Sequence, residues 1–135
     1  MDQFKLGMQV GEIKAWCEAA KNEAKEMSLS APFKPEDYET ILPYMEEHSE
    51  RNGINFYHEK KLIITDLFGD MNLSGIWVFL IYKNTEALEK YLKLKEDKEK
   101  SVASGKYEGD TRRDIAVRFG RLLGYSDTMI HERWS

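Results

Sequence analysis

The amino-acid sequence predicts an α+β fold, in which a small three-stranded antiparallel sheet packs against about five helices. Three observations indicate this class. The chain contains one uninterrupted apolar run, residues 76–82. Two strand-like segments precede that run, at 54–58 and 62–64. Segments with apolar residues at helical spacing lie on both sides of this region, so we expect helices from both ends of the chain to cover the sheet.

The apolar run 76–82 is predicted to be the central strand. A strand without alternation cannot turn one face toward water, so both faces are expected to be buried. A polar loop precedes the run, and a helix-start signal, Asn84-Thr85, follows it. Segment 54–58, a turn around Glu59-Lys60 and segment 62–64 predict a hairpin, which the loop 69–75 connects to the central strand. The simplest arrangement is a sequential meander.

Two helices are predicted before the strands. The first has an apolar stripe formed by Ile13, Trp16, Cys17, Ala20, Ala24 and Met27. Residues 28–32 then form a connector. Pro35 can occupy the first turn of the second helix, which Asn52-Gly53 ends. Pro43 lies inside this helix and is expected to bend or divide it, because proline lacks an amide donor and crowds the preceding turn.

Three further helices are predicted after the central strand. The first begins near Thr85 and fades into the charge run 95–100, so that 95–110 is a candidate mobile linker within a single domain, 1–135. Thr111 is a suitable N-cap for the next helix, and Gly124 is well placed as the left-handed residue that ends it. Ser126-Asp127 can cap a final short helix.

Composition and charge limit the class of protein. The chain has 135 residues, of which 41% are hydrophobic and 33% are charged, and its formal net charge is -4. Residues 1–59 hold 6 basic and 12 acidic side chains, whereas residues 60–135 hold 14 and 12. A general nucleic-acid binder normally has a strongly basic face, so nucleic acid is an unlikely partner. The basic second half leaves room for one local anion site.

The single cysteine, Cys17, bears on the compartment. One cysteine allows neither an intrachain disulfide nor a multi-cysteine zinc site, and on an apolar helical stripe it is expected to be an inert core residue. No leader peptide or lipidation signal is recognised, and the run 76–82 is too short to cross a bilayer. The sequence therefore predicts a cytoplasmic protein without a membrane partner.

The C-terminal segment, Gly120-Arg121-Leu122-Leu123-Gly124-Tyr125-Ser126, resembles the terminal motif of an uncharacterised prokaryotic protein family. In that motif a Leu-Leu-Gly-Tyr-Pro sequence follows a helix. The resemblance covers roughly the last 25 residues, and this chain has Ser126 in place of the proline and Thr128-Met129 where the family often has cysteines. The resemblance implies a small cytoplasmic α+β domain and carries no assigned activity.

Arginine is concentrated near the C-terminus, where five of the six arginines lie at positions 112, 113, 118, 121 and 133. Guanidinium groups bind carboxylates and phosphates through paired hydrogen bonds, and a helix N-terminus favours an anion. The candidate anion-binding residues are Arg112, Arg113, Arg118, Arg121, Tyr125 and His131. Alternatively, these arginines pair with the acidic first half of the chain, especially Glu36, Asp37, Glu39, Glu46, Glu47 and Glu50. Tyr125 either packs on the helix or exposes its hydroxyl beside the arginines.

The sequence predicts no metal site and no cofactor. His48, His58 and His131 lack the spacing of a zinc-binding helix. Asp66 and Asp70 bracket a glycine and are explained as turn residues without a magnesium ion.

The preferred function is a non-catalytic cytoplasmic binding or interaction module. Its partner is either a second copy of the chain, forming a homo-oligomer, or an anionic small molecule, and the helix 112–125 is the expected contact surface. The alternative is a small enzyme acting on a phosphorylated or carboxylated substrate. In that case Arg113 and Arg121 would hold the anion, with His131 or Asp114 as general base. The enzyme requires these groups to converge in one cleft, whereas arginines paired with acids would argue against it.

Overall fold

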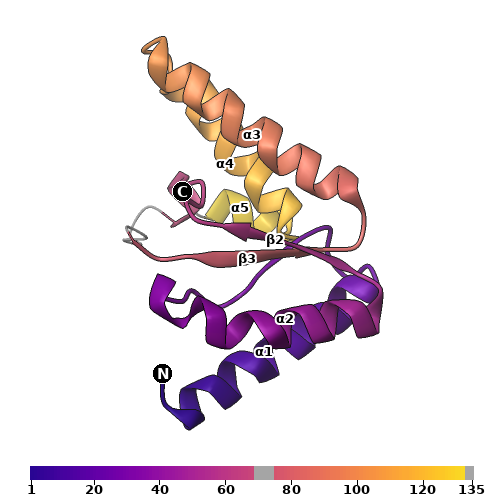
Figure 1. Ribbon diagram of the computed structural model, residues 1–135. Coiled ribbons are helices and arrows are strands. Elements are labelled where there is room, and N and C mark those ends of the chain that lie inside the picture. The colour runs from indigo at the N-terminus through magenta and orange to yellow at the C-terminus, as the bar shows by residue number, and fades with distance from the viewer. Residues whose placement is uncertain (69–74, 133–135) are drawn as a thin grey trace.

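The computed structural model describes residues 1–68 and 75–132, and it has the predicted α+β architecture. A three-stranded sheet lies between two layers of helices (Figure 1). Helices α1 (Gln3–Lys21) and α2 (Tyr38–Asn52) cover one face. Helices α3 (Thr85–Ala103), α4 (Gly109–Leu122) and α5 (Asp127–Glu132) lie on the other side. The α3–α4 hairpin extends beyond the sheet.

Strand β3 (Val78–Tyr82) is the central strand, and all five of its residues are buried. Its side chains alternate between two cores. Val78, Leu80 and Tyr82 belong to the core shared with α3 and α4, whereas Phe79 and Ile81 belong to the core shared with α1 and α2. The prediction from the unbroken apolar run is therefore confirmed, because each face of the strand needs apolar residues when both are covered.

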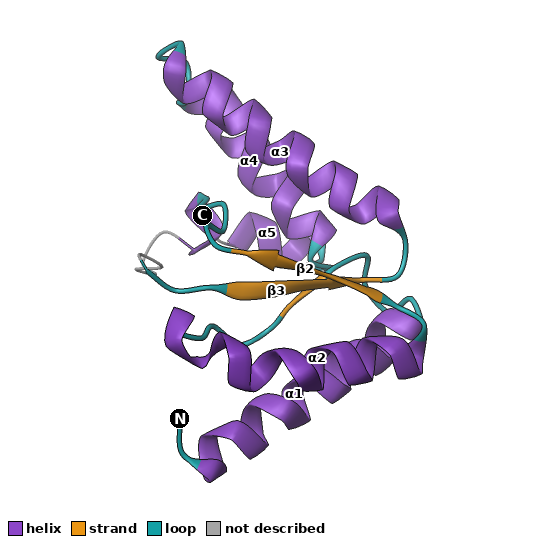
Figure 2. Cartoon of the chain, in the orientation of Figure 1, coloured by secondary structure: helices purple, strands orange, loops and turns teal. Residues whose placement is uncertain are grey.

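The identity of one edge strand was predicted wrongly. The sheet order is β1-β3-β2, with both pairs antiparallel. Strand β2 (Asn55–Glu59) agrees with the prediction, but segment 62–64 is not a strand. The third strand is β1 (Ser28–Leu29), in the segment expected to be a connector. The order in the sheet therefore departs from a sequential meander (Figure 2).

Hydrogen bonds explain why β1 replaces segment 62–64. The amide of Ser30 donates to the carbonyl of Phe79 over 2.9 Å, and the amide of Phe79 donates to Ser30 Oγ over 2.8 Å. Segment 62–64 hydrogen-bonds to α3 instead: the amide of Ile63 donates to the Tyr91 hydroxyl over 3.1 Å. A buried amide must be satisfied by some partner, and here a side chain supplies it.

Helix α2 is continuous, although Pro43 lies inside it, so the expected division is wrong, and the alternative, a bend, stays a prediction. A 3-10 turn, η1 (Pro35–Asp37), leads into the helix. Pro43 removes only one main-chain hydrogen bond, and the apolar face of α2 packs on the sheet, which compensates for that loss. As predicted, α2 ends at Asn52-Gly53, and Gly53 is in the left-handed conformation, at φ 63.

The charge run 95–100 continues the helix, so the expected fading of α3 is also wrong: α3 extends to Ala103. Ion pairs one turn apart support it, with Lys93 Nζ 2.9 Å from Asp97 and Lys100 Nζ 2.7 Å from Glu96. Only residues 104–108 separate α3 from α4, which begins at Gly109 and thus two residues before the predicted cap. Gly124 follows α4 with φ 81, as predicted.

Candidate functional site

The arginines predicted to form one anion site are divided between at least two places. Arg112 is held by Asp66, which lies in the 3-10 turn η2 (Asp66–Phe68). Arg112 Nε lies 2.8 Å from Asp66 Oδ2, and Nη2 lies 2.7 Å from Oδ1. This paired geometry is the one in which a guanidinium binds a carboxylate most strongly. Arg112 is thus already occupied by an acid of the same chain.

Arg118 and Arg121 lie together at a cavity of about 320 Å³ between α3 and α4, which Lys90 and Lys93 also line. Of the predicted anion-binding residues, the fold brings Arg118 and Arg121 together here, and the two lysines were not predicted. Carboxylates are close to both arginines: Arg118 Nη2 lies 3.0 Å from Asp97, and Arg121 Nε lies 3.4 Å from Asp127. An anion in this cavity would have to compete with those carboxylates.

The other predicted site residues add little to this cavity. Arg113 is an exposed residue of α4. Tyr125 is half-buried and lines a separate cavity with Trp16, Lys25 and Leu123. His131 lies on α5. Arg133 and Asp70 lie outside the described residues.

The partners of the arginines differ from the predicted ones. The acidic residues 36–50 belong to η1 and α2, on the face of the sheet opposite α4 (Figure 1). The sheet therefore separates them from the arginines. Asp66, Asp97, Asp114 and Asp127 take their place as partners of Arg112, Arg118 and Arg121. The predicted alternative of pairing within the chain is thus correct in kind, and wrong in its partners.

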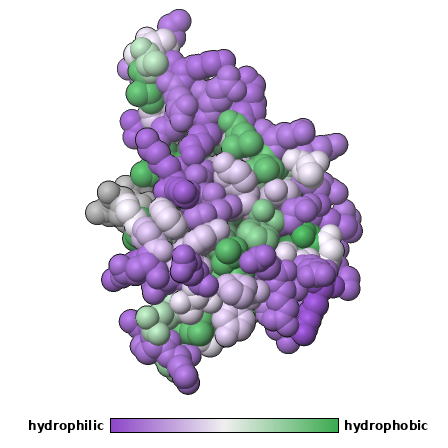
Figure 3. Space-filling model, viewed as in Figure 1, coloured by the Kyte–Doolittle hydropathy of each residue, from purple (hydrophilic) through white to green (hydrophobic). Residues whose placement is uncertain are grey.

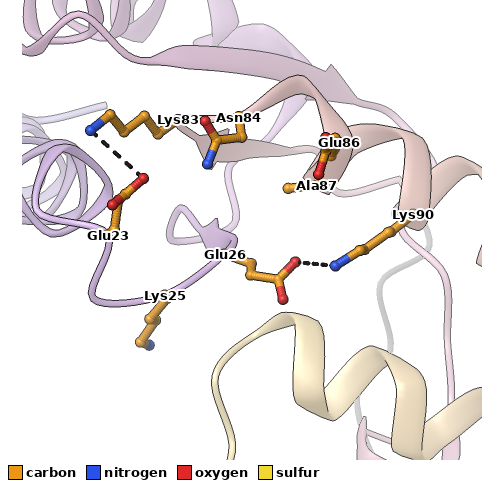
Figure 4. A pocket seen from close by; sticks show the side chains of 8 residues that line it. All are labelled: Glu23, Lys25, Glu26, Lys83, Asn84, Glu86, Ala87 and Lys90. Atoms are coloured by element: carbon orange, nitrogen blue, oxygen red, sulfur yellow. Dashed lines mark hydrogen bonds and ion pairs between the residues drawn. The ribbon is translucent and has the colours of Figure 1, made fainter.

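A second charged cavity, of about 350 Å³, lies at the start of α3 (Figure 4). Two ion pairs cross it: Lys90 Nζ lies 2.8 Å from Glu26, and Lys83 Nζ lies 3.8 Å from Glu23. The lining contains three lysines and three glutamates, so their charges balance. This balance favours a solvated surface of internal ion pairs over an anion site.

An apolar cavity, about 360 Å³ in volume, lies between segment 61–64 and the second half of α3, and we call it the α3 groove. Ile64 on one wall and Val102 on the other have exposed fractions of 40% and 57%. Three lysines stand around these apolar walls. The groove is lined by Lys61, Leu62, Ile63, Ile64, Lys95, Lys98, Glu99, Val102 and Ala103.

A buried carboxylate fixes the inner end of the α3 groove. Glu59 is 4% exposed, and its Oε2 accepts hydrogen bonds from the Tyr91 hydroxyl over 2.6 Å and from Lys95 Nζ over 2.9 Å. Its Oε1 accepts from the amide of Lys61 over 2.9 Å. Burial, and then the hydrogen bond to Glu59, raise the pKa of Tyr91 above its usual range. The network is fully satisfied and positions two lysines of the groove, so its role is structural.

The outer rim of the groove is positively charged. Lys98 Nζ donates to the carbonyl of Ile64, and both Lys98 and Arg112 lie over the ring of Tyr107, 5.2 and 5.4 Å from its centroid. Burial lowers the pKa of Lys98, and the charges of Arg112 and Lys61 lower it further. Two cations thus lie close to Lys98 at this rim, while the charge of Asp66 opposes their effect on its pKa. Of the predicted anion-binding residues, Arg112 adjoins the groove.

His58 lies among aromatic rings in the described part of the chain. Among the described residues, no group of three or more histidine, cysteine or acidic side chains could hold a metal ion. His58 instead stacks on the Tyr38 ring at a centroid distance of 4.2 Å, with Trp77 at 4.6 Å. Its Nε2 is buried without a hydrogen-bond partner among the described residues. Burial lowers the pKa of His58, Lys60 lowers it further, and Glu59 opposes this shift.

The lowered pKa of His58 predicts that acid destabilises the fold. Above the ordinary histidine pKa of 6.5, the side chain is neutral in both folded and unfolded chains and does not affect the free energy of unfolding. Below it, the unfolded chain binds the proton more readily, so stability falls until the pH drops below the folded-state pKa. Urea unfolding between pH 7.5 and 5 would compare the wild type with His58→Phe. We expect the stability difference to shift in favour of His58→Phe as the pH falls, and a constant difference would contradict this.

Cys17 is a core residue, as its place on the apolar stripe predicted. It is 0% exposed, and burial, followed by the nearby Glu18 charge, raises its pKa to about 11. A thiol with a raised pKa remains protonated at neutral pH and is a poor nucleophile. Cys17 therefore contributes packing and no chemistry.

The α3 groove was not predicted, because both of its walls were expected to belong to other structures. Segment 62–64 appeared to be a strand, and Val102 fell within the candidate linker. The missed signal was helical spacing: Lys95, Lys98 and Val102 occupy positions i, i+3 and i+7, which lie on one helix face. Continuing α3 through the charge run would have revealed this stripe.

None of the helices in the described part of the chain has the length and apolar character that crossing a membrane requires.

The chain was compared with protein families, curated proteins and solved structures. The C-terminal resemblance to the Leu-Leu-Gly-Tyr-Pro family stays a prediction. No family model matches this chain, and neither the curated proteins nor the solved structures contain a match to it.

Proposed function

We propose that this protein is a non-catalytic interaction module, which binds a short apolar segment bearing acidic side chains in the α3 groove. The supporting observation is the combination of exposed β-branched walls with a lysine rim. Ile64 and Val102 leave apolar surface in water, which is unfavourable unless a partner covers it. Figure 3 shows apolar side chains at the tip of the molecule, where Figure 1 places the end of α3.

Charge selects the kind of segment. The groove and its inner end contain three lysines, Lys61, Lys95 and Lys98, and two carboxylates, Glu59 and Glu99, which leaves one excess positive charge. Arg112 and Asp66 neutralise each other at the rim. An acidic side chain placed beside the apolar contact would therefore be attracted, and a basic one repelled.

A protein segment suits the groove better than a small amphiphile. Small-molecule sites usually enclose most of their ligand, whereas both walls of this groove are open to solvent at Ile64 and Val102. Covering both walls at once requires a partner that extends along α3. An apolar helix or strand would do this by placing one or two side chains between the walls.

The enzyme alternative has less support. It depends on arginines that converge with a general base in one cleft. Arg121, one of the two arginines assigned to the anion, instead lies 3.4 Å from Asp127, and Asp114, one candidate base, lies 3.5 Å from Arg118 on exposed helix surface. We also infer a cytoplasmic location, which the single buried thiol of Cys17 supports.

A peptide titration tests the proposed function. The probe is a capped synthetic peptide of leucine and glutamate, and the matched peptide replaces every glutamate with lysine. We expect the acidic peptide to shift the amide resonances of residues 61–64 and 95–103 in NMR spectra, and the basic peptide to leave them unchanged. Higher ionic strength should weaken binding.

Two variants locate the binding surface. Val102→Glu places a negative charge on the groove wall and is expected to weaken binding of the acidic peptide by at least about tenfold. Met8→Glu is the matched control, because Met8 on α1 has the same exposed fraction, 57%, as Val102. The proposal fails if both peptides bind equally, if the acidic peptide does not bind, or if the two variants weaken binding to the same extent.

A further inference from the structure

Helix α1 carries an apolar stripe on its outer side, where no other part of the described chain covers it. Phe4 and Met8 are 77% and 57% exposed, and Gly11 and Ala15 continue the line. The spacing of four, three and four residues is that of a heptad seam. The stripe lies opposite the buried face of the helix, which contains Gln9, Ile13, Cys17 and Ala20. Figure 3 shows apolar side chains on the part of the molecule where Figure 1 places α1 and α2.

The glycines of α1 give an independent indication of a partner. Glycine inside a helix costs about 1 kcal/mol relative to alanine. A Cβ built at Gly7 or at Gly11 would have nothing within 4 Å, so packing within the chain does not require a glycine at either position. Glycine does allow the close approach of a second helix. A partner helix on this face would therefore explain why Gly7 and Gly11 are glycines, which packing within one chain does not explain.

We propose that the partner is a second copy of this chain, bound through an antiparallel pair of α1 helices. In antiparallel pairing the a positions of one helix meet the d positions of the other. Phe4 then lies over Ala15 of the second copy, and Met8 lies over Gly11 of the second copy. Each large side chain meets a small one, and the two-fold axis repeats both contacts. The stripe is thus complementary to itself in size.

Charge selects the antiparallel direction. Lys5 and Glu12 lie on the same flank of the stripe, in equivalent heptad positions, and neither has an ion-pair partner in residues 1–68 or 75–132. Antiparallel pairing places Lys5 of each copy beside Glu12 of the other, which gives two attractive pairs. On the opposite flank Lys14 meets Gly7. A parallel pair would place Glu12 opposite Gly7 and would form neither attraction.

The size of the surface predicts a weak dimer. A single pair of helices in contact over about three turns buries an area at the low end of specific interfaces, which is typical of reversible association. The cavity lined by Gln3, Leu6, Gly7, Val10 and Tyr44 extends the surface along one flank, where the aliphatic stem of Lys14 from the second copy would lie. Dimerisation should therefore depend on concentration.

Sedimentation equilibrium tests the dimer directly. We expect the wild type to show a monomer–dimer equilibrium, and Phe4→Glu or Met8→Glu to raise its dissociation constant at least tenfold. Val102→Glu, on the α3 groove, should leave the constant unchanged. Circular dichroism during heating should show that the variants remain folded, because these side chains are exposed.

A charge exchange tests the direction of pairing. Lys5→Glu alone places like charges together at both ends of the interface, as does Glu12→Lys alone, so each should weaken the dimer several-fold. The double variant recreates both pairs with the signs exchanged and should restore the wild-type constant. Three results would overturn the proposal: a wild type that stays monomeric at high concentration, single variants that dimerise normally, or a double variant that shows no restoration. The peptide titration on the α3 groove is independent of all three.

Discussion

Replacing Phe79 with alanine is expected to lower the free energy of unfolding by about 3–5 kcal/mol, the range found when a buried aromatic residue is truncated. Phe79 is 0% exposed at the centre of β3. Its ring lies 4.9 Å from that of Phe33 and 5.4 Å from that of Phe56. The backbone on either side is held by hydrogen bonds to β1 and β2, so the cavity cannot close easily. Urea denaturation would measure the change.

Phe4 provides a matched control for Phe79. It is also a phenylalanine, but it is 77% exposed on α1, so Phe4→Ala should change the free energy of unfolding by less than about 0.5 kcal/mol at concentrations where the chain is monomeric. Phe79→Leu keeps most of the side-chain volume and should cost less than Phe79→Ala. If Phe79→Ala and Phe4→Ala lowered the free energy of unfolding equally, Phe79 could not be the core residue described here.

Replacing Glu59 with alanine is the second large effect expected, at about 2–4 kcal/mol of lost stability. The substitution removes the acceptor of three hydrogen bonds, from the hydroxyl of Tyr91, the ammonium of Lys95 and the amide of Lys61. The hydroxyl of Tyr91 would remain buried with no carboxylate to accept its hydrogen bond. Lys95 contributes less to the loss, because its side chain is 24% exposed and can reach water.

A double-mutant cycle separates the Glu59–Tyr91 interaction from general damage to the fold. Glu59→Ala, Tyr91→Phe and the double variant would be compared by urea denaturation. Because the two groups share one short hydrogen bond, the two losses should not add, and the double variant should be more stable than their sum predicts by about 1–3 kcal/mol. Glu89→Ala, at an exposed position of α3, is the control and should have little effect. Strict additivity would show that Glu59 and Tyr91 do not stabilise the fold through each other.

Local patterns in the sequence were sufficient for the parts of the fold that depend on neighbouring residues. The apolar run 76–82 required burial on both faces whatever its partners, and Gly53 and Gly124 ended their helices because glycine tolerates positive φ. The β1 strand escaped prediction because it has only two residues, Ser28–Leu29, too few to show an alternation. Its position depends on main-chain bonds to β3, which composition does not record.

The candidate site was much less predictable than the fold. The arginine cluster was visible, but its members occupy different places, and their partners lie in η2, α3 and α5. The walls of the α3 groove come from segments far apart in the chain. Lys61 and Val102 become neighbours around one cavity only because Glu59 and Tyr91 hold segment 61–64 against α3.

Local patterns of residues were enough to predict the α+β class, the central strand and the main helices, because periodicity, capping and glycine conformations act over a few residues. The order of the strands, the partners of the arginines and the groove became visible only in the folded chain. These features result from long-range packing, which places two layers of helices on opposite faces of β3. That separation keeps the acidic α2 from the arginines of α4 and leaves the outer side of α1 open to a second copy.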